Sequence, residues 1–134
     1  MAYGTLAVDT LNSSTGVLAS NNGMTGIAKA WVNFNGTSGA SPVIRASFNV
    51  SSVTRNSTGN YTVTYGTAQP SANYCWAYAG NNSDDTLGTV NSTLVVTTNA
   101  LQTTSSLTFV TKLNTGSSSG LADMSLITIT VFGA

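Results

Sequence analysis

Residues 27–50, IAKAWVNFNGTSGASPVIRASFNV, decide the fold class, because apolar and polar side chains alternate on both sides of a turn. A period of two residues is typical of β-strands with one buried face. Residues 27–34 and 43–50 are therefore predicted strands, and the Gly-rich segment 35–42 is the predicted loop of their hairpin. The side chains predicted to point inward are Ala28, Ala30, Val32, Phe34, Ile44, Ala46, Phe48 and Val50.

The same alternation recurs as far as the end of the chain. Further strands are predicted at residues 61–65, 74–79, 89–97, 106–113 and 125–132. The last of them carries apolar residues on both faces, which suits a strand in the middle of a sandwich or at a subunit contact. Residues 1–26 have no strong period, and we expect an irregular N-terminal arm that serves as a docking segment. About seven to eight short strands predict one all-β domain over residues 27–134, an antiparallel β-sandwich resembling a jelly roll.

Ionisable side chains are scarce, and this scarcity bounds the function. The 134 residues include no histidine, four basic and four acidic side chains. General acid–base catalysis, nucleophilic triads and structural zinc sites all draw on such groups at close range. We therefore expect no enzyme activity, no catalytic residues, no metal site and no cofactor. The basic residues look dispersed and of little structural weight: Lys29, Arg45, Arg55 and Lys112.

Charge and hydropathy also limit the partners. The formal net charge is zero, so neither nucleic acid nor a membrane surface is an expected partner. No apolar run approaches the ~20 residues of a membrane span, and the first residues lack the blocks of a signal peptide. Synthesis in a reducing cytosol is expected. Cys75 has no second cysteine to pair with and is predicted to be an inert buried thiol.

Four short motifs follow one another in the first half of the chain. They are AKAWVNFNG at 28–36, RASFNVSS at 45–52, GNYTV at 59–63 and PSANY at 70–74. Together they resemble a module of tail fibres, fibre knobs and small virion proteins of tailed bacteriophages. The opening GTLAVDTLNSSTG, residues 4–16, is similar to the segment that precedes this module. The resemblance implies an all-β knob, often trimeric, in the virion.

Two placements in the particle follow from this resemblance. A capsid decoration or cement protein would be a homotrimer that docks on the major capsid protein through residues 1–26. A tail or head fibre knob would join other fibre proteins and touch a host receptor or glycan through loops 35–42 and 81–86. We favour decoration and keep the knob as the alternative. In both cases the protein is made in the host cytoplasm and ends in the virion, and a polysaccharide-degrading enzyme is disfavoured by the dispersed carboxylates.

Four residues are candidate contacts for a glycan or a partner. Trp76 shares a predicted strand face with Tyr74 and Tyr78, and such a row of aromatic rings either stacks on sugars or fills the core; we favour the core. Trp31 is a candidate for the same roles, with packing under a neighbouring strand or subunit favoured. Asp84 and Asp85 crowd oxygen ligands into one loop, which could hold a cation, but an ordinary solvated loop is favoured.

Overall fold

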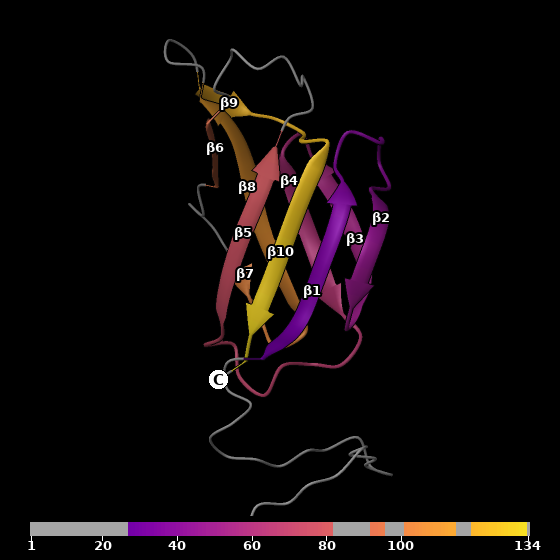
Figure 1. The fold of residues 1–134 in the computed structure, drawn as a ribbon, viewed down its shortest axis with the longest axis vertical. Coiled ribbons are helices and arrows are strands. Elements are labelled where there is room, and N and C mark those ends of the chain that lie inside the picture. Colours follow the sequence, from indigo (N-terminus) through magenta and orange to yellow (C-terminus); the bar gives the residue numbers. More distant parts are fainter. Residues whose placement is uncertain (1–26, 82–91, 96–100, 115–118, 134) are drawn as a thin grey trace, which may run out of the picture.

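The computed structural model describes residues 27–81, 92–95, 101–114 and 119–133. These ranges form two antiparallel β-sheets that pack against each other, with no helix (Figure 1). The prediction of an all-β antiparallel sandwich is thus confirmed. No stretch in the described ranges is a helix of the length and hydropathy needed to cross a membrane.

The chain passes between the two sheets several times. The four-stranded sheet has, side by side, β2 (Val43–Phe48), β1 (Ala28–Asn35), β10 (Leu126–Phe132) and β5 (Cys75–Asn81). The other sheet has β3 (Val50–Ser57), β4 (Asn60–Tyr65), β8 (Ser106–Asn114) and β6 (Ser92–Val95), and the short strands β7 (Leu101–Gln102) and β9 (Ser119–Leu121) also pair with β8. The strand with two apolar faces, β10, lies between β1 and β5, as its sequence predicts.

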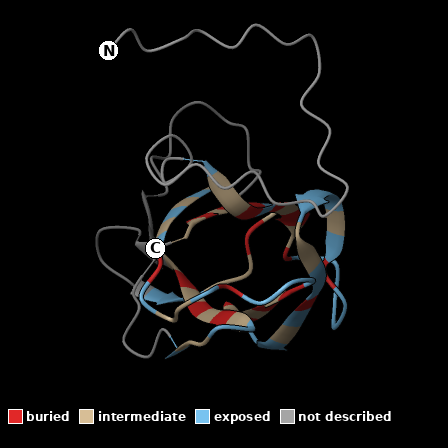
Figure 2. Cartoon of the chain, turned by 90° about the horizontal axis from the view of Figure 1, so that it is seen from below, coloured by how far each residue is buried: buried red, intermediate tan, exposed pale blue. Residues whose placement is uncertain are grey.

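The core lies between the sheets and follows the predicted alternation. Buried and less buried residues alternate along the strands in Figure 2. Aromatic rings join the layers, because Phe109 of β8 lies 6.2 Å from Trp76 and 6.4 Å from Tyr78, both of β5, measured between ring centroids. The buried hydrophobic side chains are Ala30, Val32, Phe34, Val53, Tyr61, Val63, Tyr65, Tyr74, Leu107, Phe109, Met124, Ile127, Ile129 and Val131.

The prediction that Ala46 and Phe48 point inward is wrong, and a β-bulge is the reason. Phe34 pairs with Ile44 but Asn33 pairs with Ala46, so the register shifts by one residue at Arg45. A shift of one residue moves every later side chain of a strand to the opposite face. Ile44 therefore packs on the core, whereas Phe48 is 54% exposed on the outside.

Residues 43–50, predicted as one strand, are divided at Asn49. This residue has a φ of 52°, a left-handed conformation that asparagine tolerates better than most residues. Its side chain holds the corner: Nδ2 donates to the backbone oxygens of Lys29 at 3.0 Å and Thr67 at 3.1 Å, and Oδ1 accepts from the Thr67 N–H. The chain thereby leaves β2 in one sheet and enters β3 in the other.

Gly59, in the β3–β4 turn, combines a positive φ of 64° with a close approach of two other backbones. A Cβ there would lie 2.6 Å from the Thr111 carbonyl oxygen and 2.7 Å from the Ala122 nitrogen. We expect Gly59→Ala to lower the free energy of unfolding by about 3 kcal/mol or more, from backbone strain plus this clash. Thermal and denaturant unfolding will measure the loss.

Gly39→Ala is the matched control, because Gly39 also has a positive φ, 88°, but its Cβ would meet nothing within 4 Å. We expect this change to cost only the strain, about 1 kcal/mol. Equal effects of the two substitutions would show that the close approach at Gly59 does not matter.

Candidate functional site

The outward side of the four-stranded sheet is an uncharged surface. Two rows of paired residues cross it, and we call them together the outer face: Phe48, Trp31, Thr130 and Ala77 in one row, and Ala46, Asn33, Thr128 and Ala79 in the other. Trp31 is 36% exposed and Phe48 54% exposed. None of the eight side chains is ionisable, so the outer face offers rings, methyl groups, hydroxyls and one amide.

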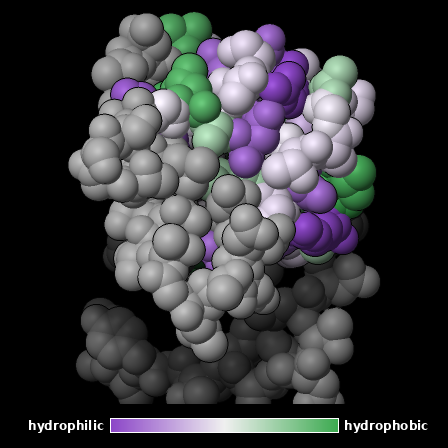
Figure 3. Space-filling model, turned by 90° about the horizontal axis from the view of Figure 1, so that it is seen from above, coloured by the Kyte–Doolittle hydropathy of each residue, from purple (hydrophilic) through white to green (hydrophobic). Residues whose placement is uncertain are grey.

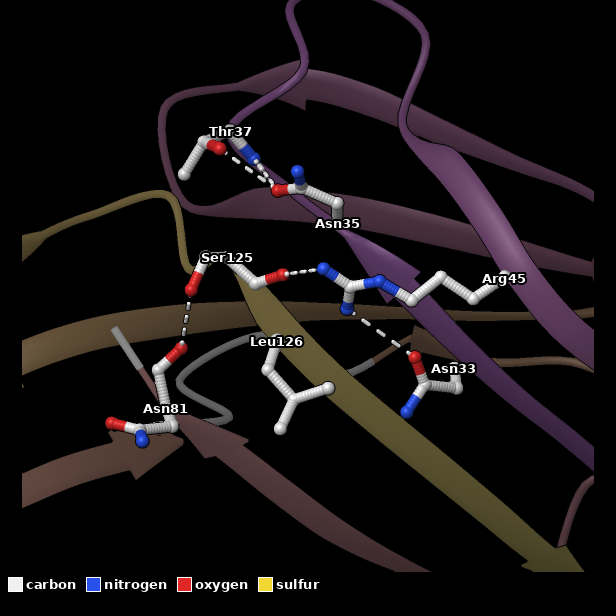
Figure 4. Close-up of a pocket in the computed structure, with 7 residues that line it drawn as sticks. All are labelled: Asn33, Asn35, Thr37, Arg45, Asn81, Ser125 and Leu126. Atoms are coloured by element: carbon white, nitrogen blue, oxygen red, sulfur yellow. Dashed lines mark hydrogen bonds between the residues drawn. The ribbon is translucent and has the colours of Figure 1, made fainter. Parts of the chain in front are cut away.

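A hollow opens at the end of this face, beside the β1–β2 loop and the start of β10. Its volume is about 500 Å³, and we call it the Arg45 hollow after its single charged residue. It is lined by Asn33, Asn35, Thr37, Arg45, Asn81, Ser125 and Leu126 (Figure 4). Seen from above in Figure 3, the loop end of the sandwich has hydrophilic residues beside isolated hydrophobic ones. Amides, hydroxyls and a guanidinium thus meet around one open space.

Arg45 is held across the hollow by uncharged groups. Nη2 donates to the Ser125 carbonyl oxygen at 2.9 Å, and Nη1 lies 3.4 Å from Asn33 Oδ1 and 3.5 Å from the Phe34 carbonyl oxygen (Figure 4). Asn33 is itself fixed, because its Nδ2 donates to Thr128 Oγ1 at 3.1 Å. No carboxylate among the described residues pairs with Arg45.

The guanidinium of Arg55, unlike that of Arg45, pairs with a carboxylate. Its Nε donates to both oxygens of Asp123 at 3.0 Å, and its Nη2 donates to Oδ2 at 2.7 Å. This side-on, two-pronged pairing is the strongest common geometry between arginine and a carboxylate. The expectation that Arg55 is a dispersed charge of little structural weight is therefore wrong.

Asp123 is the centre of a polar junction between three connections of the chain. Its Oδ1 accepts from the backbone N–H of Gly59, in the β3–β4 turn, at 2.8 Å, and from the hydroxyl of the buried Tyr61. The Tyr61 hydroxyl also lies 3.2 Å from the Gly36 carbonyl oxygen, in the β1–β2 loop. We call Arg55, Asp123, Tyr61, Gly59 and Gly36 the Asp123 junction.

This junction positions the hollow. The backbone N–H of Gly36 donates to the Met124 carbonyl oxygen at 2.8 Å, which ties the β1–β2 loop to the segment before β10. Asn35 and Thr37 flank Gly36, and Ser125 follows Met124 directly, so this single contact helps to place three lining residues. A Cβ at Gly36 would lie 2.9 Å from the Met124 carbonyl oxygen, so only glycine permits this approach without a shift.

The junction also sets the protonation of its members. Burial alone would raise the pKa of Asp123, but hydrogen bonds from Arg55, the Gly59 backbone and Tyr61 outweigh it and lower the pKa below its ordinary 3.8. Burial, reinforced by the hydrogen bond to Asp123 and by its charge, raises the pKa of Tyr61 well above 10.0. At neutral pH the carboxylate is therefore an acceptor and the phenol a donor.

The predicted contact residues separate into three groups. Trp31 lies on the outer face, partly exposed. Trp76 is on the inner side of β5, half-buried and packed on the core, which is where the packing interpretation puts it. Asp84 and Asp85 lie outside the described residues. Cys75 is exposed, so the prediction of a buried thiol is wrong: Trp76 and Tyr78 occupy the inner side of β5, which turns Cys75 outward.

Sequence reasoning did not find the Arg45 hollow. Its lining comes from β1, β2, β5, β10 and the β1–β2 loop, and residues 33 and 125 are far apart in the chain. A weak signal is present: Arg45 is a polar residue on the outward side of a predicted strand, in a hairpin with the predicted strand that contains Asn33. No group of His, Cys, Asp and Glu in the described ranges is arranged to hold a metal ion.

Comparison with known proteins adds no family to this description. No family model, curated protein or solved structure was found to match the chain. The sandwich, the outer face and the Arg45 hollow therefore carry the functional argument.

Asp123→Asn tests the junction through the pH dependence of stability. Because the folded-state pKa of Asp123 is depressed, its contribution is complete above pH 3.8 and is lost as the pH falls through the lower, folded-state value. We expect the variant to be less stable than the parent by about 2 kcal/mol at neutral pH. The difference should shrink as the pH falls through the depressed, folded-state pKa, because the parent carboxyl then becomes protonated too. Denaturant unfolding across this range measures both.

Tyr61→Phe is the companion variant, since it removes the hydroxyl but keeps the Arg55–Asp123 pair. We expect a loss of about 1 kcal/mol with most of the acid dependence retained. A pH-independent difference between Asp123→Asn and the parent would contradict the assignment of the acid transition to Asp123.

Proposed function

We propose that this protein is a non-enzymatic structural protein of a bacteriophage virion, a small homo-oligomer that decorates the particle surface. The observation that carries the proposal is the outer face, where Trp31 and Phe48 are exposed among eight side chains without one ionisable group. Exposed aromatic rings on an uncharged face are typical of interaction sites, because aromatic residues are enriched and charged residues depleted in interfaces. The phage-type motifs between residues 28 and 74 support the virion as the setting.

A second copy of the chain is the partner that the outer face fits best. The formal net charge is zero, so copies do not repel one another as they approach. Burial of the outer face would also leave no uncompensated charge in the contact, since it has no ionisable side chain. A trimer is the state that the resemblance implies, and docking on the major capsid protein would use other surfaces.

The absence of catalysis is supported by what the described charges do. Asp123 and Arg55 neutralise each other in the junction, and the Asp123 carboxylate accepts two further hydrogen bonds, from the Gly59 N–H and the Tyr61 hydroxyl, that also lower its pKa. A carboxylate held in its ionised form by such contacts is a poor general acid at neutral pH. Arg45 lines a polar hollow, and no general base among the described residues lies beside it.

The alternative is a tail or head fibre knob that binds a host-cell receptor or glycan. One observation favours it, the Arg45 hollow, because amides and hydroxyls around an open space of about 500 Å³ are the groups that bind sugars. The hollow adjoins the outer face on the same sheet, because Asn33 belongs to both.

Substitution of the exposed rings tests self-association. We expect Trp31→Ser combined with Phe48→Ser to shift the protein from oligomer to monomer in sedimentation and light scattering, because interface aromatic residues contribute most of the contact energy. Leu101→Ser is the control: Leu101 is 64% exposed on β7 of the other sheet and should leave the oligomer intact. A monomeric parent, or an unchanged oligomer in the double variant, would contradict the proposal.

Cys75 reports on the same contact without any engineered label. It is exposed on β5, paired with Phe132, next to the outer-face residue Ala77. We expect a thiol reagent to modify Cys75 slowly in the oligomer and at least about tenfold faster in the monomeric double variant, if the contact extends to β5. Equal rates would confine the contact to the β2–β1 side of the face.

The copy number in purified particles separates the two placements. Quantitative mass spectrometry against the major capsid protein should give hundreds of copies for a decoration protein. Tens of copies or fewer would place the protein on a tail or vertex and favour the knob. Its absence from the particle would overturn the virion assignment.

A further inference from the structure

We propose that the Arg45 hollow binds a carboxylated sugar, the chemical class of uronic and sialic acid residues. This deepens the alternative function, the glycan-binding knob, and rests on it for the biological source of the ligand. The binding chemistry itself is argued from the hollow alone and does not depend on where the protein lies in the particle.

The charge of Arg45 is the first part of the argument. Its guanidinium has five N–H groups, and the described contacts engage Nη1 and one direction of Nη2. No described partner contacts Nε, so the Nε–Nη2 edge can still take an anion. That is the edge with which Arg55 holds the Asp123 carboxylate, so this chain already shows the geometry that an incoming carboxylate would adopt.

Arg45 is also held in place before any ligand arrives. The Ser125 carbonyl oxygen fixes Nη2 at 2.9 Å, and Asn33, itself anchored on Thr128, lies beside Nη1. A long side chain that is already ordered loses less conformational entropy on binding than a free one. The hollow therefore presents a guanidinium fork that one close contact and two longer ones hold at the surface.

The rest of the lining suits hydroxyl groups. Asn35 Oδ1 accepts from the backbone N–H of Thr37 at 2.9 Å and from its hydroxyl at 2.8 Å, which orients the Asn35 Nδ2 donors without using them. Asn81 accepts from Ser125 Oγ through its backbone oxygen at 3.3 Å, and its side-chain amide has no described partner. An amide offers a donor and an acceptor side by side, which matches vicinal sugar hydroxyls.

Size and net charge select a sugar acid among anions. A volume of about 500 Å³ lies in the range of small-molecule sites, roughly 300–1,000 Å³. Leu126, 39% exposed, supplies apolar surface for the C–H groups of a ring. The lining contains one cation among seven residues, which suits a singly charged carboxylate better than a doubly charged phosphate.

The test compares two ligands that differ only in the carboxylate: methyl β-glucuronide and methyl β-glucoside. Titrations followed by NMR on the isolated full chain should show the glucuronide binding at least about tenfold more tightly, from the charge-assisted pair with Arg45. Signals of Asn35, Asn81 and Ser125 should move together. The preference should weaken as salt is added, because the pair is solvent-exposed.

Variants locate the site. Arg45→Gln should abolish the preference for the glucuronide, and Arg45→Lys, which keeps the charge but loses the fork, should reduce it several-fold. Lys112→Gln removes one positive charge from β8 of the other sheet and should change nothing. Unfolding curves of all three variants confirm that each is folded before binding is compared.

Four outcomes would overturn the inference: no saturable binding of the glucuronide, equal binding of the glucoside, an unchanged preference in Arg45→Gln, or acetate and a peptide carboxyl terminus binding as tightly as the glucuronide. The failure of the knob function is distinguishable from these. Adsorption to host cells without a carboxylate preference would retain the knob and reject the sugar acid. A carboxylate preference in a protein present in hundreds of copies would retain the sugar acid and reject the knob.

Discussion

The rest of the structure depends on the hydrogen bonds that the Asp123 carboxylate accepts. It accepts hydrogen bonds from Arg55 on β3, from the Gly59 turn and from Tyr61 on β4, while the neighbouring Met124 accepts from Gly36. The chain has only four basic and four acidic side chains, and Arg55–Asp123 is the ion pair that its described residues form. The Arg55 and Asp123 side chains are 24% and 20% exposed, so these hydrogen bonds form in partly buried surroundings, where they are stronger than in water.

The junction and the hollow are parts of one arrangement. The Gly36 carbonyl oxygen contacts the Tyr61 hydroxyl, and the Gly36 N–H donates to the Met124 carbonyl oxygen. The neighbours Asn35 and Thr37 then line the hollow. The core aromatic rings reinforce this, because Phe34, whose carbonyl oxygen lies near Arg45, packs its ring 5.4 Å from that of Tyr61. Contacts from the interior of the sandwich therefore hold the β1–β2 loop that lines the hollow.

The sequence predicted the parts of the fold that depend on a period of two. β1, β4, β5, β8 and β10 lie within a residue or two of the predicted strands. Ala30, Val32 and Phe34 of β1 are buried as predicted, whereas Ala28, beyond a register shift in the pairing with β10, is outside the core. Strand β3 was missed because Val53 is its one buried side chain, so an edge strand of polar residues resembles a loop. The bulge at Arg45 and the corner at Asn49 were also missed, since a single irregular residue leaves no trace in the hydrophobic period.

The site was less predictable than the fold for a related reason. Arg55 and Asp123 are 68 residues apart, and Arg45 and Ser125 are 80 apart, so no local pattern connects them. Trp31 could be placed on an outward side because its strand alternates regularly. Which outward residues are flanked by a hollow depends on the register between β1, β2 and β10, and that register is set by the bulge.

The pairing of Ala28 with Phe132 gives the molecule a polarity. The first and last described strands start and finish at the same end of the sandwich, while Asn35, Asn81 and Ser125 lie at the other end (Figure 1). Paired residues in an antiparallel ladder are about 5 Å apart. The chain therefore enters β1 and leaves β10 at neighbouring points on one end of the sandwich. A tether attached at that end would hold the domain there and leave the opposite end, with Asn35, Asn81 and Ser125, accessible to other surfaces.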